Sequence, residues 1–459
     1  MIRRQSGPAS YVLAVALLGA VPACANVHRA RFAQDPASAV PGERTPTAAE
    51  LGLPTSGRVA LDLLVKTALS VHPTVVGARR AAEAAHARIR AAEGATRPKA
   101  TVQTSASYRD QSANATGSEE HRFESYGFDV SWLLFDFGGR SALVCQAAQQ
   151  WIAAQLDART TEVDAAFAVR LGYFELEKDI ELLATAHETV AQFESHLAQV
   201  TEFERVGSRI PYDVTKAKVD LGNAKLAEVE ARDAILTAEA TLANAVGIAE
   251  TVDWQPDPSD GARVEAFAPK DFDAAWAVTL PSRPSLAAAA ARERAASALI
   301  DARVAALYPS LSLGAGFSRT GPNPPMPWTF NLGPSVQWTP FDGFQNLASI
   351  DESVATLSST RAARAKEEQR AFLDVRTAWI AIEDAKRRLE LSDLLVKSAE
   401  ENLGLAQGRF AAGLGTSVDL SDARQALVSA RTGRIEARAD RAIASARFAQ
   451  AVGLVAPHP

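Results

Sequence analysis

The sequence contains little cysteine, few aromatic residues and none of three common catalytic motifs. Only 2 of its 459 residues are cysteine, and only 7% are aromatic. It contains no G-x-x-x-x-G-K-[ST] phosphate loop, no G-x-S-x-G nucleophile elbow and no H-E-x-x-H zinc motif. The 7 histidines are scattered, and the formal net charge of -6 indicates no polyanionic partner. We therefore predict neither catalysis, nor a cofactor or metal site, nor binding to nucleic acid.

Proline is absent from three long stretches, residues 99–210, 212–255 and 341–456. Because proline ends or kinks a helix, each stretch has room for a long helix without a break. Residues 26–58, in contrast, contain several prolines and no periodicity, which is typical of an extended arm.

The first 25 residues have the features of an export signal. Arg3 and Arg4 precede an apolar stretch too short to span a membrane, and small residues follow it. Cleavage after Ala25 and lipidation of Cys24 at a new N-terminus both remain open. Either outcome leaves Cys145 without a disulfide partner, so we interpret it as a small apolar helix residue.

The chain contains an internal duplication. The unusual spacing W-x-x-F-D occurs at 132–136 and again at 338–342, and "AVG" recurs at the same offset at 245–247 and 451–453. Two structural repeats, residues 59–247 and 271–453, are therefore predicted, with a linker at 248–270 and a tail at 454–459.

Each repeat contains one interval in which the hydrophobic period changes. Four segments alternate apolar with small or polar residues, as half-buried strands do, at about 98–110, 122–135, 309–319 and 329–341. The rest of each repeat has helical periodicity, including a heptad seam that begins at Leu183. A continuous helix over the proline-free residues 141–206, which contain this seam, would be on the order of 100 Å long.

These lengths predict a mainly α fold with a membrane β part. Strands of about ten residues suit a membrane barrel, but four strands cannot close one, and open sheet edges are not tolerated in lipid. Several chains must therefore contribute to one barrel. If three chains do so, twelve strands close it, and their long helices continue the barrel as a helical cylinder.

The duplicated order of helix, hairpin, long helix, glycine turn and returning helix resembles the TolC-like outer-membrane efflux proteins. The resemblance covers roughly residues 59–453 and includes "FDFGG" at 135–139 and "RFAAGLGTSVDL" at 409–420. It implies a trimer with a twelve-stranded outer-membrane barrel and a periplasmic helical tunnel. It also implies a passive exit duct that serves a periplasmic adaptor protein and an inner-membrane pump or ABC exporter.

The resemblance also implies functional residues at the helix turns. Tips that contact the adaptor would comprise Val206, Gly207, Ser208, Gly413 and Leu414. A periplasmic gate of carboxylates would comprise Asp419, Asp422 and Asp213. Two residues depart from the pattern: Gly415 replaces an arginine and Phe410 a tyrosine that tie the closed tip together in some members.

Residue chemistry alone offers two interpretations of the same aspartates. Carboxylates three residues apart share a helix face, and threefold symmetry would crowd six of them around one axis. Alternatively, they merely complement the positive end of a helix on a solvated surface.

The repeated W-x-x-F-D motif supplies the last candidate site. Its residues Trp132 and Trp338 are expected in an aromatic girdle at the membrane boundary, and Asp136 and Asp342 at the hinge between barrel and tunnel. Strand-end tryptophans followed by helix-capping aspartates would have the same sequence.

A different function remains possible on the sequence alone. A periplasmic coiled-coil adaptor or scaffold without a pore would also contain long helices. An adaptor, however, should have one helical hairpin flanked by compact β modules, and a scaffold would leave the apolar strand faces unexplained.

Overall fold

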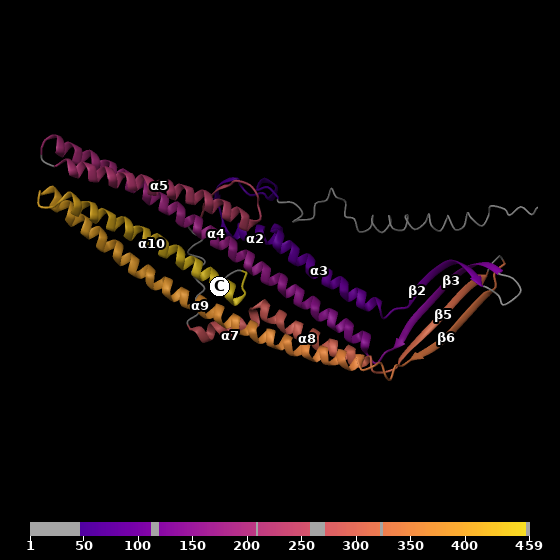
Figure 1. Ribbon diagram of the computed structural model, residues 1–459. Coiled ribbons are helices and arrows are strands. Elements are labelled where there is room, and N and C mark those ends of the chain that lie inside the picture. Colours follow the sequence, from indigo (N-terminus) through magenta and orange to yellow (C-terminus); the bar gives the residue numbers. More distant parts are fainter. Residues whose placement is uncertain (1–45, 112–118, 208–209, 258–270, 322–324, 456–459) are drawn as a thin grey trace, which may run out of the picture.

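The protein is an elongated rod of helices with a small sheet at one end (Figure 1). The computed structural model describes residues 46–111, 119–207, 210–257, 271–321 and 325–455. The proposed signal peptide and Cys24 lie outside the described residues. Within the described part, no helix combines the length and the apolar character needed to cross a membrane.

Two halves of the chain form matching series of elements. The first comprises α2 (Leu61–Val71), α3 (Pro73–Gly94), β2 (Lys99–Gln111), β3 (Glu119–Phe135), α4 (Gly139–Arg205) and α5 (Pro211–Val246). The second comprises α7 (Phe272–Ser282), α8 (Pro284–Ala305), β5 (Ser310–Gly321), β6 (Trp328–Gln337), α9 (Gln345–Ala411) and α10 (Ser417–Val452). Helices α4 and α9 each contain 67 residues, and α5 and α10 each contain 36.

The first helical segment of each half is divided into two helices, α2 and α3 in the first half and α7 and α8 in the second. The break falls at His72-Pro73 and at Arg283-Pro284, where ψ of the residue before proline is 126° and 113°. Proline disfavours the helical conformation of the residue before it but suits the first position of a new helix. Each proline therefore ends one helix and begins the next.

The sheet joins the two halves. Its order is β2-β3-β5-β6, with every neighbouring pair antiparallel, so the hairpin of each half pairs with the other through β3 and β5. Strand β6 ends at Gln337, four residues before the expected end at 341. Pro340, which cannot donate a ladder hydrogen bond, lies among residues 338–341, which were expected in the strand but do not belong to it.

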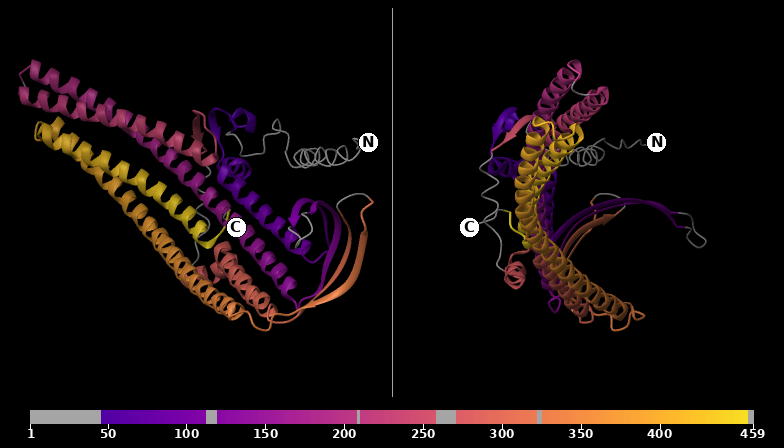
Figure 2. Two further views of the ribbon diagram at one scale, coloured as in Figure 1. Left: turned by 45° about the vertical axis from the view of Figure 1, so that its right-hand side comes forward. Right: turned by 90° about the vertical axis from the view of Figure 1, so that its left-hand side faces the viewer.

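The helices form one curved layer (Figure 2). Near the sheet the order across the layer is α3, α4, α8, α9, and toward the tips it is α5, α4, α10, α9. Helix α5 ends where α3 begins, and α10 ends where α8 begins. A Cβ atom on Gly453, which has φ +93°, would lie 2.8 Å from Cα of Arg283, so the second junction requires glycine.

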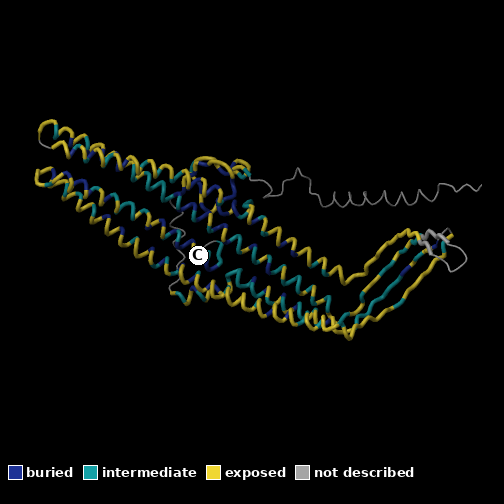
Figure 3. The backbone as a smooth tube through the Cα atoms, viewed as in Figure 1, coloured by how far each residue is buried: buried dark blue, intermediate teal, exposed yellow. Residues whose placement is uncertain are grey.

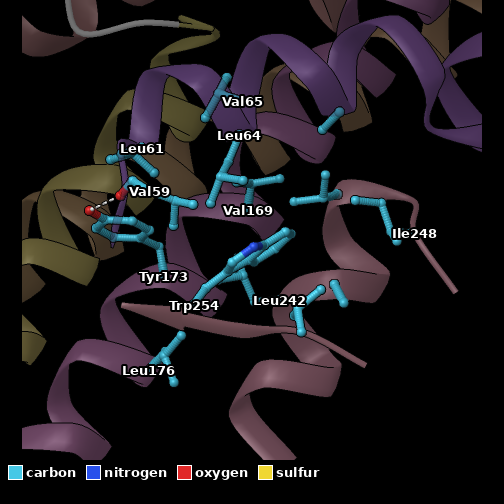
Figure 4. Packing of buried hydrophobic residues seen from close by; sticks show 14 of the residues in the cluster. Val59, Leu61, Leu64, Val65, Val169, Tyr173, Leu176, Leu242, Ile248 and Trp254 are labelled. Carbon is cyan, nitrogen blue, oxygen red and sulfur yellow. Dashed lines mark hydrogen bonds between the residues drawn. The ribbon is translucent and has the colours of Figure 1, made fainter. Parts of the chain in front are cut away.

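The main hydrophobic core is formed largely by residues of α2, α4 and α5 (Figure 4). Strand β1 (Ser56–Val59), from the N-terminal arm, pairs in parallel with β4 (Asp253–Pro256), from the linker between the halves. Trp254 is fully buried, and its Nε1 donates to the carbonyl oxygen of Pro54 at 2.7 Å. The arm and the linker are therefore fixed to each other and to the helices. A second buried cluster packs α7 against α9 and α10. Toward the tips most residues of the helices are exposed or partly buried (Figure 3).

Candidate functional site

The repeated tryptophan makes the same hydrogen bond in each half. Nε1 of Trp132 donates to the carbonyl oxygen of Thr96 at 3.0 Å, and Nε1 of Trp338 donates to that of Leu307 at 3.1 Å. Trp132 lies within β3, and Trp338 directly follows β6. Trp132 is 40% exposed and Trp338 is 60% exposed. Each ring thus ties the strand leading to a long helix to the turn where the preceding helix ends.

The repeated aspartate accepts hydrogen bonds from the first turn of the long helix. Oδ2 of Asp136 accepts from the amide and Nε of Arg140, at 2.8 and 3.0 Å. Oδ2 of Asp342 accepts from the amide of Asn346 at 2.9 Å. Amides in a first helical turn have no partner within the helix, so both carboxylates satisfy one.

Between each aspartate and its helix lie two consecutive residues with positive φ. They are Phe137 (53°) and Gly138 (88°) in the first half, and Gly343 (71°) and Phe344 (68°) in the second. The phenylalanine is strained there, and it packs on an aromatic neighbour: Phe137 on Tyr308 at 4.8 Å and Phe344 on Phe341 at 5.4 Å between ring centroids. Sequence reasoning missed this pair, because phenylalanine and glycine exchange places between the halves.

The predicted tip residues lie at the end of the rod away from the sheet (Figure 1). Gly207 and Gly413 both have positive φ, at 74° and 73°, and both end a long helix. Val206 and Leu414 are 62% and 77% exposed. Ser208 lies outside the described residues. The two turns therefore present apolar side chains to solvent in a single chain.

The predicted gate carboxylates lie in or near the first turns of the returning helices. Asp419 forms a capping box, in which its amide donates to Oγ1 of Thr416 and its Oδ2 accepts from the Thr416 amide, both at 3.1 Å. The backbone and then the side-chain hydrogen bond of Thr416 lower the pKa of Asp419. Asp422 is exposed, whereas Asp213, in the first turn of α5, is buried. The helix-complement interpretation thus has a geometric basis for Asp419.

Phe410 and Gly415, the two residues that depart from the family pattern, both lie in close contact with neighbouring residues. Phe410 is 6% exposed and packs near the rings of His196 and Phe203, at 6.2 and 6.4 Å. A Cβ atom on Gly415 would lie 3.1 Å from the backbone nitrogen of Phe410. Any larger residue would therefore require the backbone at Phe410 to shift by a few tenths of an ångström.

A polar cluster in the tip half was missed by sequence reasoning. His196 of α4 lies among Phe410 of α9, Arg424 of α10 and Asp220 of α5. Oγ of Ser421 in α10 donates to Oδ2 of Asp220 at 2.6 Å, which links the two helical hairpins. The only signal in the sequence was a histidine beside the heptad seam, which does not identify partners on three other helices.

Further along the rod, arginines of α10 bind glutamates of α4. Arg431 lies 3.0 Å from Glu188, and Arg438 lies 3.0 Å from Glu181. Each pair is partly exposed, so its contribution to stability is small, about 0.2–1 kcal/mol. Among the described residues, no three His, Cys, Asp or Glu side chains are grouped so that they could hold a metal ion.

Comparisons with known proteins agree with this geometry. The profile of a family described as "Outer membrane efflux protein" matches residues 64–248 and 278–454, which is more than half of the chain. The probable efflux pump outer membrane protein TtgC of Pseudomonas putida is 24% identical over 328 residues, covering 69% of this chain and 66% of its own length. The match thus spans just under two thirds of that relative.

Solved structures are similar over most of the chain. A crystal structure of a membrane protein from Pseudomonas aeruginosa has a TM-score of 0.77 at 23% identity and covers 85% of this chain and 92% of its own. The outer membrane protein VceC of Vibrio cholerae has a TM-score of 0.74 at 18% identity, with 86% and 96% covered. These similarities confirm the predicted fold class.

Proposed function

Since the chain belongs to the outer membrane efflux protein family, we propose that it is the passive exit duct of a tripartite efflux or type I secretion system. Membership confirms two predictions, the location in the outer membrane and the absence of enzymatic activity. The proposed duct receives substrate from an inner-membrane pump or ABC exporter through a periplasmic adaptor.

The open-edged sheet carries this proposal. Its edge strands β2 and β6 have no further strand beside them within the described residues, and its four strands contain 13, 17, 12 and 10 residues. One face carries exposed apolar side chains, including Phe128, Phe317 and Phe330. An apolar face suits lipid, but free strand edges inside lipid do not, so further copies must complete the barrel. Three copies would supply twelve strands.

The edge helices of the tip half support closure into a ring. Helix α5, at one edge of the layer, exposes Val219, Leu226, Val229 and Leu236, spaced by seven, three and seven residues on the side away from its buried face. Helix α9, at the opposite edge, exposes Leu391, Leu394 and Leu405. Coiled-coil seams with this spacing stabilise helix pairs when a second helix covers them. In the proposed trimer, α5 of one copy packs on α9 of the next.

Within this duct the W-x-x-F-D residues form the boundary between barrel and tunnel. Trp132 and Trp338 stand at the aromatic girdle, and Asp136 and Asp342 at the hinge. Support comes from the position of all four, where the strands give way to the long helices. The proposed domain limits remain those of the sequence, with repeats at 59–247 and 271–453.

The tips and gate complete the proposed path. The adaptor contacts Val206, Gly207, Ser208, Gly413 and Leu414. Asp419, Asp422 and Asp213 line the narrowest point when three copies surround one axis. The exposure of Asp419 and Asp422 in the single chain supports this position, whereas Asp213 is buried in the single chain.

Fractionation separates the duct from an adaptor or scaffold without a pore. We expect the full chain in the outer-membrane fraction, extractable only with detergent and trimeric after purification. Recovery in the soluble periplasm without detergent would contradict the proposal.

Conductance in planar bilayers tests the gate. Replacing Asp419 and Asp422 together by Ala should raise single-channel conductance or reduce cation preference, because three copies of each carboxylate leave the constriction. The exposed Asp440, farther along α10, provides the control as Asp440→Ala. Unchanged conductance and selectivity in the double variant would show that these side chains do not line the constriction.

A further inference from the structure

One histidine in the tip half of the rod is buried without a hydrogen-bond partner. His196 is 1% exposed, and neither of its ring nitrogens has a partner among the residues that the structure describes. An unpaired polar group in a packed interior costs free energy, which is recovered when the group reaches water. The packing around His196 is therefore less favourable than that of an apolar ring of the same size.

Each of the other helices in the tip half contributes one side chain to the surroundings of His196. Helix α9 contributes the ring of Phe410, 6.2 Å away between centroids. Helix α10 contributes Arg424, whose Nη1 is also buried without a partner among the described residues. Helix α5 contributes Asp220, which Lys216 of the same helix approaches to 3.2 Å.

This cluster joins the two helical hairpins near their free ends. The first hairpin consists of α4 and α5, and the second of α9 and α10. The 2.6 Å hydrogen bond from Ser421 to Asp220 crosses between them, as does the contact of His196 with Phe410. Separating the hairpins at this level would break both contacts and expose His196 to water.

The cluster disfavours a charge on His196. Burial and, to a smaller extent, the neighbouring Arg424 lower the pKa of His196 from 6.5 to about 4, against the opposite effect of Asp220. The packed state therefore holds a neutral ring at neutral pH.

We propose that His196, Asp220, Phe410, Ser421 and Arg424 form a latch that holds the two hairpins together near the tips, and that proton uptake by His196 releases it. We call these five residues the His196 latch. The inference rests on the proposed function, in which separated hairpins open the duct. It also supplies a closing contact for a chain that has Phe410 and Gly415 in place of a tyrosine and an arginine.

The direction of the pH effect follows from linkage. Once the hairpins separate, water reaches His196 and its pKa returns to its ordinary value. Between the two pKa values, the separated state therefore binds a proton that the packed state does not bind. Acid therefore favours separation between pH 6.5 and about 4, and the effect vanishes above pH 7. From pH 8 to pH 5 the equilibrium should shift toward separation about 30-fold in each protomer.

Spin-label distances between the two tips measure this equilibrium directly. Labels at Val206→Cys and Leu414→Cys, in a full chain with Cys145→Ala, report on one turn from each hairpin. Dilution with unlabelled chains limits the signal to pairs within one protomer. We expect the distance distribution of the detergent-solubilised trimer to shift to longer values from pH 8 to pH 5.

Matched variants assign the shift to one side chain. His196→Phe and His196→Leu cannot titrate and should keep the pH 8 distribution at pH 5. His187→Gln, an exposed position of the same helix paired with Glu228, should respond like the unaltered chain. The tip carboxylates are common to all four proteins, so their titration cancels in the comparison.

Two results would overturn the latch. One is an unaltered chain whose tips do not separate in acid, and the other is an acid response that survives in both His196 variants. Neither depends on conductance. A chain that conducts without the acid response thus contradicts only the latch, and one that responds without conducting contradicts only the proposed duct.

Discussion

At the scale of single residues, the turn between each strand and its long helix shows how a capping bond and a strained residue occur together. Asp136 accepts two hydrogen bonds from Arg140, and Asp342 accepts one from Asn346. Both caps precede a helix that starts after two left-handed residues, one of which is phenylalanine. Such a residue costs about 1–2 kcal/mol, so the cap and the aromatic contact must offset that cost.

The two aspartates therefore form a matched pair for mutation. Asp342→Ala should lower the free energy of unfolding by about 1 kcal/mol, the usual cost of a lost cap. Asp136→Ala should cost about 2 kcal/mol, because the ion pair with the half-buried Arg140 is lost as well. Guanidinium unfolding of the detergent-solubilised protein, followed by helical circular dichroism, measures both. Equal losses would show that the Arg140 side chain contributes nothing.

Sequence reasoning located these capping aspartates but not the His196 latch. The aspartates recur in a motif, and their partners lie four residues ahead, so local sequence contains the whole interaction. The partners of His196 lie on three other helices, and Asp220 and Arg424 are distant in sequence. Contacts of that kind depend on helix register, which periodicity does not specify.

At the scale of elements, the end-to-end junctions of helices are the feature that the sequence only partly predicted. Absent prolines and the period of 3.6 predicted the long helices, and alternation predicted the four strands. The breaks at His72-Pro73 and Arg283-Pro284, where one helix ends and the next begins, were not predicted. The parallel pair of β1 and β4 was missed because four-residue strands carry no period.

The junction of α10 and α8 yields a test with an internal control. Gly453→Ala places Cβ 2.8 Å from Cα of Arg283 in a conformation with φ +93°, so the helix ends must move apart. Gly52→Ala imposes a similar backbone strain, at φ +69°, but its Cβ would meet nothing within 4 Å. We expect a loss of about 1 kcal/mol for Gly52→Ala and at least twice that for Gly453→Ala. Similar unfolding midpoints for the two variants would contradict a tight junction.

At the scale of the whole molecule, the single chain is an open layer, because neither its sheet nor its helical layer closes on itself. The sheet ends in β2 and β6, and the tip half of the helical layer ends in α5 and α9. The sheet and the helical layer are both curved (Figure 2). The same symmetry rotation, applied to whole chains, would therefore close the sheet into a barrel and the helical layer into a tunnel. The apolar seam on α5 is the part of this edge that mutation can probe without touching the membrane region.

A lysine in that seam should weaken the assembly. Leu226 is 59% exposed in one chain and would be buried against α9 of the neighbouring copy, where an unpaired ammonium group is unfavourable. Leu226→Lys should therefore shift detergent-solubilised protein from trimer toward monomer in sedimentation velocity runs. Ala227→Lys adds the same charge at the next, exposed position, which lies outside the seam, and should leave the trimer intact. If both variants remain trimeric, α5 does not form the contact between copies; if both dissociate, added charge rather than the seam is responsible.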